Sequence, residues 1–214
     1  MVGASVLATA VALLGGAGQA AAQTPVALWH MDETSGTIMH DASGHGHNGT
    51  LHSVTLGATG ESGKAYTFAG KPSYVSMPAS PALNPGASNI TISVWVNTTN
   101  LPRTGDYDLV RKGDFPAQEY KVELEPSGAI ACTFHGSTGS NNATGGSGLN
   151  NGAWHQVQCI KTATQIQTWV DGTEVAFTNA TIGSISNTAG VDIGAHPGSD
   201  YYKGELDEVS ISFG

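Results

Sequence analysis

Residues 90–98, ITISVWVNT, alternate apolar and polar side chains with a period of two. Ile90, Ile92, Val94 and Val96 fall on one face, whereas Trp95 falls on the other face together with Thr and Ser residues. Successive side chains of a β-strand point to opposite faces of a sheet. This segment therefore predicts a strand with one face in a hydrophobic core.

The same alternation recurs along most of the chain. Residues 119–128, EYKVELEPSG, place Tyr120, Val122 and Leu124 inward and their charged neighbours on an outer, solvated face. Residues 166–177, IQTWVDGTEVAF, predict a hairpin, because Asp-Gly between apolar runs is a strong turn signal. Further strands are expected at 26–32, 48–55, 64–69, 73–77, 107–112, 129–135, 154–161, 190–194 and 202–213.

The fold class follows from the number and shortness of these strands. No segment has a helical period of 3.6, and no repeat of 20–50 residues occurs. Many short strands in one domain predict an all-β sandwich of two antiparallel sheets, a jelly roll. Residues 136–152, GSTGSNNATGGSGLNNG, lack an apolar pattern and are expected to form a long exposed loop.

Composition narrows the class of partner. The 214 residues contain 8 Lys and Arg against 17 Asp and Glu, a net charge of −9. Nucleic acid and anionic membranes both require basic patches, so neither is expected as a partner. The chain has 29 glycines and only 12% charged residues, which is typical of a β-rich domain with many turns.

The first 22 residues, MVGASVLATAVALLGGAGQAAA, differ from the rest of the chain. They contain no charged residue and end in three alanines, which fits cleavage of a signal peptide before Gln23. The alternative is a transmembrane anchor, but glycine and alanine dilute the apolar stretch below what a span needs. Residues 1–22 are thus a predicted signal peptide, 23–214 a single domain, and the protein is expected to be extracellular.

The chain has two cysteines, Cys132 and Cys159. Cys132 shares a strand face with Ile130 and Phe134, and Cys159 shares one with Val157, so both are expected to point into the core. In an oxidising compartment two such cysteines are expected to form a disulfide. The alternative is a pair of buried free thiols.

Six stretches, in order, carry a resemblance to a known family. They are VALWHMDETSGTIMHDASGHGHNGTL (26–51), GKAYTFAGKPSYVSMPASPALN (63–84), ITISVWV (90–96), NNGAWHQVQCIKT (150–162), TWVDGTEV (168–175) and YYKGELDEVSIS (201–212). Together they resemble the laminin-G-like, concanavalin A-like jelly-roll domains of secreted bacterial proteins. The resemblance implies a two-sheet sandwich, often with a structural calcium ion, and a role in carbohydrate binding or adhesion.

A calcium site is expected between the two ends of the domain. By the period of two, Asp207 shares the inward face of Val209, Ile211 and Phe213, where an unpaired carboxylate is costly. Asp41 offers a second carboxylate, and the turn that contains Ser43 and His45 offers backbone carbonyls. Calcium prefers such oxygen ligands, and the resemblance points to the same place. The predicted ligands of this structural ion are Asp41, Ser43, His45 and Asp207.

The histidines of residues 40–52, HDASGHGHNGTLH, suggest a rival site. Imidazoles of His40, His45, His47 and His52 could bind zinc or copper. Convergence of these side chains on one point is not visible in the sequence, and exposed loop histidines are the simpler interpretation.

The acidic residues argue against a polysaccharide-degrading enzyme. The jelly-roll architecture also occurs in retaining glucanases, which use an E-x-D-x-E strand, but Glu205, Asp207 and Glu208 break that spacing. Glu123 and Glu125 share a face without a third acid. A lyase would need a Tyr/His pair together with Arg or Asn, but no recognisable His–Tyr motif accompanies the two arginines, Arg103 and Arg111. A non-catalytic module is predicted, with a polysaccharide-degrading enzyme as the alternative.

Exposed aromatic side chains are the expected ligand contacts of a carbohydrate-binding module. The candidates are Trp95, Tyr107, Trp169, Tyr201 and Tyr202, of which the two tryptophans lie opposite the aliphatic faces of their strands. The expected partner is a polysaccharide or a cell-surface glycan. An adhesion module that binds protein without affinity for sugar is an alternative that the residues leave open.

Overall fold

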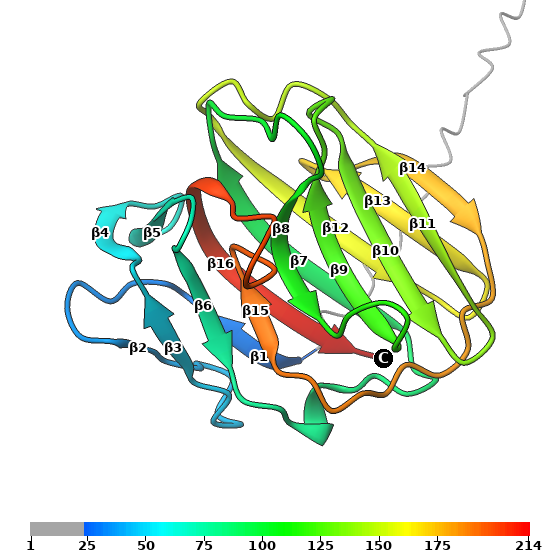
Figure 1. The fold of residues 1–214 in the computed structure, drawn as a ribbon. Coiled ribbons are helices and arrows are strands. Elements are labelled where there is room, and N and C mark those ends of the chain that lie inside the picture. The colour runs from blue at the N-terminus through cyan, green and yellow to red at the C-terminus, as the bar shows by residue number, and fades with distance from the viewer. Residues whose placement is uncertain (1–23) are drawn as a thin grey trace, which may run out of the picture.

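A computed structural model describes residues 24–214, and almost all regular structure in this range is β-strand. Two antiparallel sheets pack face to face (Figure 1), which confirms the predicted all-β jelly-roll sandwich. The predicted signal peptide lies outside the described residues. Between residues 24 and 214 no helix is long and apolar enough to span a bilayer.

The first sheet contains eight strands. β16 (Lys203–Phe213) lies near its centre and pairs with β7, with β5 and with β1. The order is β14 (Thr173–Asn179), β13 (Gln165–Val170), β12 (Trp154–Lys161), β7 (Ile90–Asn97), β16, β5 (Lys64–Ala69) and β4 (Thr55–Thr59), with β1 (Pro25–Trp29) paired to β16 off this path.

The second sheet also contains eight strands. Its order is β11 (Gly139–Gly145), β10 (Ile130–Gly136), β9 (Glu119–Leu124), β8 (Tyr107–Lys112), β15 (Val191–Ile193), β6 (Tyr74–Met77), β3 (Gly49–His52) and β2 (Ile38–Met39). A 3-10 turn, η1 (Pro81–Leu83), precedes β7.

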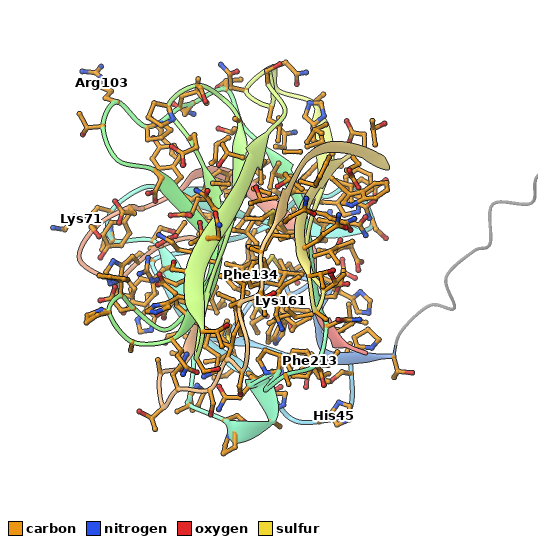
Figure 2. All side chains as sticks on the ribbon, turned by 90° about the vertical axis from the view of Figure 1, so that its right-hand side faces the viewer. His45, Lys71, Arg103, Phe134, Lys161 and Phe213 are labelled. Atoms are coloured by element: carbon orange, nitrogen blue, oxygen red, sulfur yellow. A yellow bond between two sulfur atoms is a disulfide. The ribbon has the colours of Figure 1, made fainter. Side chains whose placement is uncertain are left out.

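The core fills the space between the sheets. Val94 of β7 pairs with Val157 of β12, and both side chains are fully buried. They belong to the same hydrophobic cluster as Val122 and Phe134 of the second sheet. Figure 2 shows Phe134 in the space between the sheets, whereas the labelled side chain of His45 points away from it. The alternation in ITISVWVNT therefore predicted the buried face correctly.

A disulfide joins the two sheets. Cys132 of β10 and Cys159 of β12 are bonded with their Cα atoms 5.3 Å apart, which confirms the predicted pairing. The two residues are 27 positions apart in sequence. In the chain-entropy model, a disulfide that closes a loop of this length stabilises the folded protein by about 3.5 kcal/mol.

The exposed loop expected at residues 136–152 is only partly a loop. Residues Gly139–Gly145 form the edge strand β11, which pairs with β10 in regular antiparallel register. Ala143 alone in this strand is buried, so backbone pairing rather than apolar alternation makes the strand. Composition could not predict a strand in which almost every side chain is polar and exposed.

Candidate functional site

The predicted calcium ligand Asp41 organises a turn. Its Oδ1 accepts hydrogen bonds from the backbone N–H of Leu28 (3.1 Å) and of Ser43 (2.9 Å). Its Oδ2 accepts hydrogen bonds from the Ser43 hydroxyl (2.8 Å) and the backbone N–H of His47 (2.9 Å). Burial favours a higher pKa, but these hydrogen bonds outweigh it and lower the pKa of Asp41 below its ordinary value. Four donors thus satisfy this carboxylate.

The structure places Ser43 and His45 beside Asp41, whereas Asp207 accepts its hydrogen bonds from the backbone of Ser62 and Glu208. The Ser43 hydroxyl lies 3.0 Å from Nδ1 of the exposed His45. The hydrogen-bond partners of Asp207 have no residue in common with those of Asp41. Asp41 and Asp207 therefore belong to separate hydrogen-bond networks, and calcium binding by the four predicted ligands stays a prediction.

A bulge in β16 explains the position of Asp207. The register between β16 and β7 shifts after Asp207, and Glu208 has a positive φ of 48°. Leu206 and Val209 both enter the core across this bulge, and Asp207 pairs with Trp95 on the outer side. The expectation that Asp207 shares the inward face of Val209 is therefore wrong, because the period of two is interrupted.

Asp207 lies beneath the turn that joins β4 to β5. Its Oδ2 accepts a hydrogen bond from the backbone N–H of Ser62 (3.0 Å). Asp32 flanks the same turn, with Oδ1 accepting a hydrogen bond from the backbone N–H of Lys64 (2.6 Å). A Cβ atom at Gly60 would clash with Asp207 and with the Lys64 carbonyl, and one at Gly63 would clash with Asp32. Two carboxylates therefore closely flank this turn.

These groups fit calcium better than the predicted set does. They comprise two carboxylates and the carbonyl oxygens of a tight turn, which are the hard oxygen ligands that calcium prefers. Burial and the neighbouring Glu208 raise the pKa of Asp207 to about 6, although backbone hydrogen bonds act in the opposite direction. A nearby cation would relieve the cost of ionising this buried carboxyl group.

The four histidines of the rival site do not converge. His40 lies against Glu33 with a separation of 2.9 Å between Nδ1 and the carboxylate, and His52 lies 2.9 Å from the Ser76 hydroxyl. Within residues 24–214, the groups of three or more potential metal ligands contain none of these histidines. The described geometry does not form the zinc or copper site.

Two of the predicted aromatic residues lie on the outer face of the first sheet. Trp95 of β7 is paired with Gln156 of β12, and Trp169 of β13 is paired with Gln158 of β12. All four side chains are half-buried, and Ser93 lies opposite Gln158 on the other side. We call these five residues the tryptophan–glutamine face. The glutamines were not predicted, although their alternation in β12 could have indicated an outward amide row.

The three predicted tyrosines are less available. Tyr202 is fully buried and donates a hydrogen bond to the Asn97 carbonyl, so it cannot contact a ligand. Tyr107 packs edge-on against Tyr202 with ring centroids 5.9 Å apart. Tyr201 is half-buried and meets Tyr74 edge-on at 6.3 Å. Tyr202 is thus a core residue, Tyr107 is half-buried and packs against the core, and Tyr201 is half-buried beside Tyr74.

Charged residues that sequence reasoning placed in solvent are buried on the outer side of the second sheet. Glu119 and Glu123 are 3% and 4% exposed, so the predicted solvated face of β9 is wrong. Arg111 contacts Asp108 (2.8 Å), Asp114 (2.8 Å) and Glu119 (3.1 Å). The ion pairs offset part of the desolvation cost of these charged side chains, which allows them to be buried.

The carboxyl groups of this region are hard to ionise. Burial raises the pKa of Asp108 to about 7, even though Arg111 lies beside it. Burial together with the charges of Glu123 and Asp200 raises the pKa of Asp106 to about 6. Burial also raises the pKa of Asp192 to about 6 against the influence of Arg111. The outer side of the second sheet is therefore a crowded acidic region.

The carboxylates of the suspected glucanase motif diverge. Glu205 reaches the Thr67 hydroxyl, Asp207 reaches the backbone of Ser62, and Glu208 reaches His30 at 2.9 Å. Retaining hydrolysis needs two carboxyl groups directed at one bond. These three groups do not provide that arrangement.

Comparison with known proteins connects this geometry to one family. Residues 69–212 match the family Laminin_G_3, described as the concanavalin A-like lectin/glucanases superfamily. A search of curated protein sequences found no match. The jelly-roll domain expected from the six sequence stretches is thereby confirmed.

Several solved structures share the fold at low sequence identity. Domain 4 of the arabinanase AbnA from Geobacillus stearothermophilus, solved with arabinotriose, has a TM-score of 0.66 and 19% identity, with 90% of this chain and 93% of that chain covered. The binding domain of Paraclostridial Mosquitocidal Protein 1 has a TM-score of 0.68 and 16% identity, with 88% and 48% covered. Mouse laminin α1 domains LG4-5 have a TM-score of 0.57 and 16% identity, with 69% and 40% covered.

The chain spans about half the length of the mosquitocidal binding-domain structure and less than half of the laminin structure. Its match to the arabinanase domain is nearly complete in both directions. These likenesses concern the fold, and each of the three structures is described as a binding domain or as a domain of a larger protein.

Proposed function

Because the chain belongs to the Laminin_G_3 family of the concanavalin A-like lectin/glucanases superfamily, we propose that it is a secreted, non-catalytic module that binds a neutral polysaccharide. The tryptophan–glutamine face carries the proposal. Trp95 and Trp169 lie two strands apart, a separation of about 10 Å across the sheet. The two indoles can therefore contact different sugar units of one chain.

The chemistry of this face suits an uncharged glycan. Indole rings offer apolar surface to the C–H faces of sugar rings, and the amides of Gln156 and Gln158 both donate and accept hydrogen bonds. No Asp, Glu, Lys or Arg occupies the outward positions of β7, β12 and β13. The charged residues that border this face are acidic, since Asp207 pairs with Trp95 and Glu174 pairs with Trp169. They would repel an anionic polysaccharide, so a neutral glycan is favoured over an anionic one.

Binding to insoluble neutral polysaccharides tests the proposal. Arabinan comes first, because the arabinanase domain with this fold was solved with arabinotriose. Trp95→Ala and Trp169→Ala should each weaken binding about ten-fold, which corresponds to the loss of one stacking contact. Phe115→Ala is the matched control, since Phe115 is an aromatic residue with 66% exposure outside this face. Equal binding by all three variants would contradict the proposal.

The burial of the acidic residues on the outer side of the second sheet supports a non-catalytic role. Asp108 is fully buried and Glu123 is 4% exposed and paired with Lys121. Neither carboxyl group can approach a glycosidic bond without rearrangement of the sheet. We therefore expect no release of reducing sugar from any polysaccharide that the protein binds.

Calcium and secretion complete the proposal. The turn of residues 60–64, flanked by Asp32 and Asp207, would hold a structural calcium ion that links the N-terminal segment to β16. The disulfide between Cys132 and Cys159 is typical of an oxidising compartment, which supports an extracellular location. A protein partner is the alternative, and failure of a broad glycan panel would favour it.

A further inference from the structure

A second group of acidic side chains lies on the outer side of the second sheet. Asp106 precedes β8, Asp108 belongs to β8 and Glu123 belongs to β9, opposite Asp108. Their carboxylate oxygens lie within 4.8 Å of one another. Asp108 also lies within the same distance of Asp200 and His196 in the segment that follows β15. Three carboxylates, those of Asp106, Glu123 and Asp200, thus lie close to that of Asp108.

Asp108 has an oxygen with no partner. Its Oδ2 accepts a hydrogen bond from Arg111 Nη1 at 2.8 Å, whereas Oδ1 is buried and has no hydrogen-bond partner among the described residues. Oδ1 of the neighbouring Asp106 is also buried and has no hydrogen-bond partner among the described residues. Asp108 itself is 0% exposed. An unpaired buried carboxylate oxygen is costly, so two of them side by side require an explanation.

The protein's own cations do not balance this group. Arg111 divides its guanidinium among Asp108, Asp114 and Glu119, and Lys121 pairs with Glu123. Asp106 and Asp200 have no ion pair with Lys or Arg in the part of the chain that the structure describes. The group keeps an excess of negative charge at the unpaired oxygens.

Backbone hydrogen bonds hold the segment after β15 beside this group. The backbone N–H of Asp108 donates to the Asp200 carbonyl (3.1 Å), and the N–H of Gly194 donates to the Leu109 carbonyl (3.0 Å). Gly105 lies close to Asp200, where a Cβ atom would come within 3.3 Å of its carboxylate. Backbone contacts therefore hold Asp200 beside Asp108 without help from a ligand.

We infer that Asp106, Asp108, Glu123 and Asp200 bind a divalent cation, calcium, through the unpaired oxygens of Asp106 and Asp108. Hard carboxylate ligands without a thiolate favour calcium over zinc or copper. This site is separate from the turn of residues 60–64, because it belongs to the other sheet and shares no residue with it. The competing occupant of the free oxygen of Asp108 is a proton.

Calcium titration of the protein after treatment with EDTA tests the site. Isothermal titration calorimetry should give two calcium ions per chain for the wild type. Asp106→Asn should remove one of them, and Asp207→Asn should remove the other. Asp114→Asn is the matched control, because Asp114 contacts Arg111 and His196 but is not one of the four proposed ligands, and it should leave the stoichiometry unchanged.

Asp106→Asn is preferred to a change at the fully buried Asp108, because Asp106 is half-buried and its loss should leave the fold intact. If the turn of residues 60–64 binds no calcium, the wild type should bind one ion. Loss of this ion in Asp106→Asn and its retention in Asp207→Asn would then still support the site. Unchanged calcium stoichiometry in Asp106→Asn overturns the site. Binding that disappears entirely in Asp207→Asn also overturns it, and a proton then occupies Asp108.

Discussion

Asp32 and Asp207 lie at opposite ends of the folded domain in sequence, yet their carboxylates flank the same turn between β4 and β5. Asp32 accepts a hydrogen bond from the backbone N–H of Lys64, and Asp207 accepts one from that of Ser62. The turn therefore connects the N-terminal segment to β16 through two carboxylates. The predictions about calcium follow from this relationship.

Removal of calcium should lower the melting temperature of the wild-type protein. Without the ion, the buried Asp207 loses a favourable partner, and calcium stabilises the fold by binding it in preference to the unfolded chain. Asp32→Asn and Asp207→Asn should lose most of the calcium-dependent shift, whereas Asp41→Asn should retain it because four protein donors satisfy Asp41. Thermal unfolding in EDTA and in calcium measures this. A loss confined to Asp41→Asn would restore the site expected from the sequence.

Gly60→Ala should destabilise the protein and weaken calcium binding. An added Cβ at Gly60 would clash with the Lys64 carbonyl and with Asp207 Oδ2. Gly139→Ala is the control, since Gly139 also lacks a positive φ and has no atom within 4 Å of an added Cβ. Urea unfolding of the two variants should separate them by about 1–3 kcal/mol, the usual cost of overpacking. Equal stability of the two variants would mean that the turn is not closely packed.

Reduction of the disulfide should destabilise the fold without altering its sheets. Cys132 and Cys159 link β10 to β12, so the bond restricts the unfolded chain across the two sheets. The free energy of unfolding should fall by about 3.5 kcal/mol in a Cys132→Ala, Cys159→Ala double variant. Mass spectrometry of the oxidised protein supplies the control, because it should detect no thiol that reacts with an alkylating agent. Two reactive thiols would contradict the bond.

Asp41 should contribute stability that depends on pH. Its hydrogen bonds hold its pKa in the folded protein below the ordinary value of 3.8, so ionisation favours the fold. The contribution is complete above the unfolded value and is lost as the pH falls through the folded value. Urea unfolding of wild type and Asp41→Asn should therefore differ at about pH 6 and converge towards about pH 2.5. A difference that stays constant over this range would contradict the assignment.

The sequence predicted those features that follow from alternation of side chains. The period of two located the core face of β7, and it placed Cys132 and Cys159 in one core. It failed at Asp207, because one bulged residue, Glu208, inverts the faces of the strand. No pattern within residues 201–212 indicates where such a bulge lies.

Contacts between distant segments were also beyond prediction. Glu119 and Glu123 alternate with apolar residues as a solvated face would, but Arg111 and Lys121 pair with them and make burial tolerable. In the sequence, nothing distinguishes Asp32 from the other acidic residues. Only its contact with the turn of residues 60–64 in the structure identifies it as a candidate calcium ligand. Such features depend on which strands become neighbours, and local spacing does not specify this.

Three of the four tryptophans, Trp29, Trp95 and Trp169, provide the most direct measurement of the proposed glycan site. Trp29 is fully buried and donates its indole N–H to the His47 carbonyl, so it serves as an internal control, whereas Trp95 and Trp169 lie on the tryptophan–glutamine face. Arabino-oligosaccharide and other neutral oligosaccharides would be titrated into ¹⁵N-labelled protein while the four indole N–H signals are followed by NMR. Binding at the proposed face should shift the signals of Trp95 and Trp169 in a saturable manner and leave Trp29 unchanged. A ligand that binds without moving the Trp95 and Trp169 signals would contradict the account.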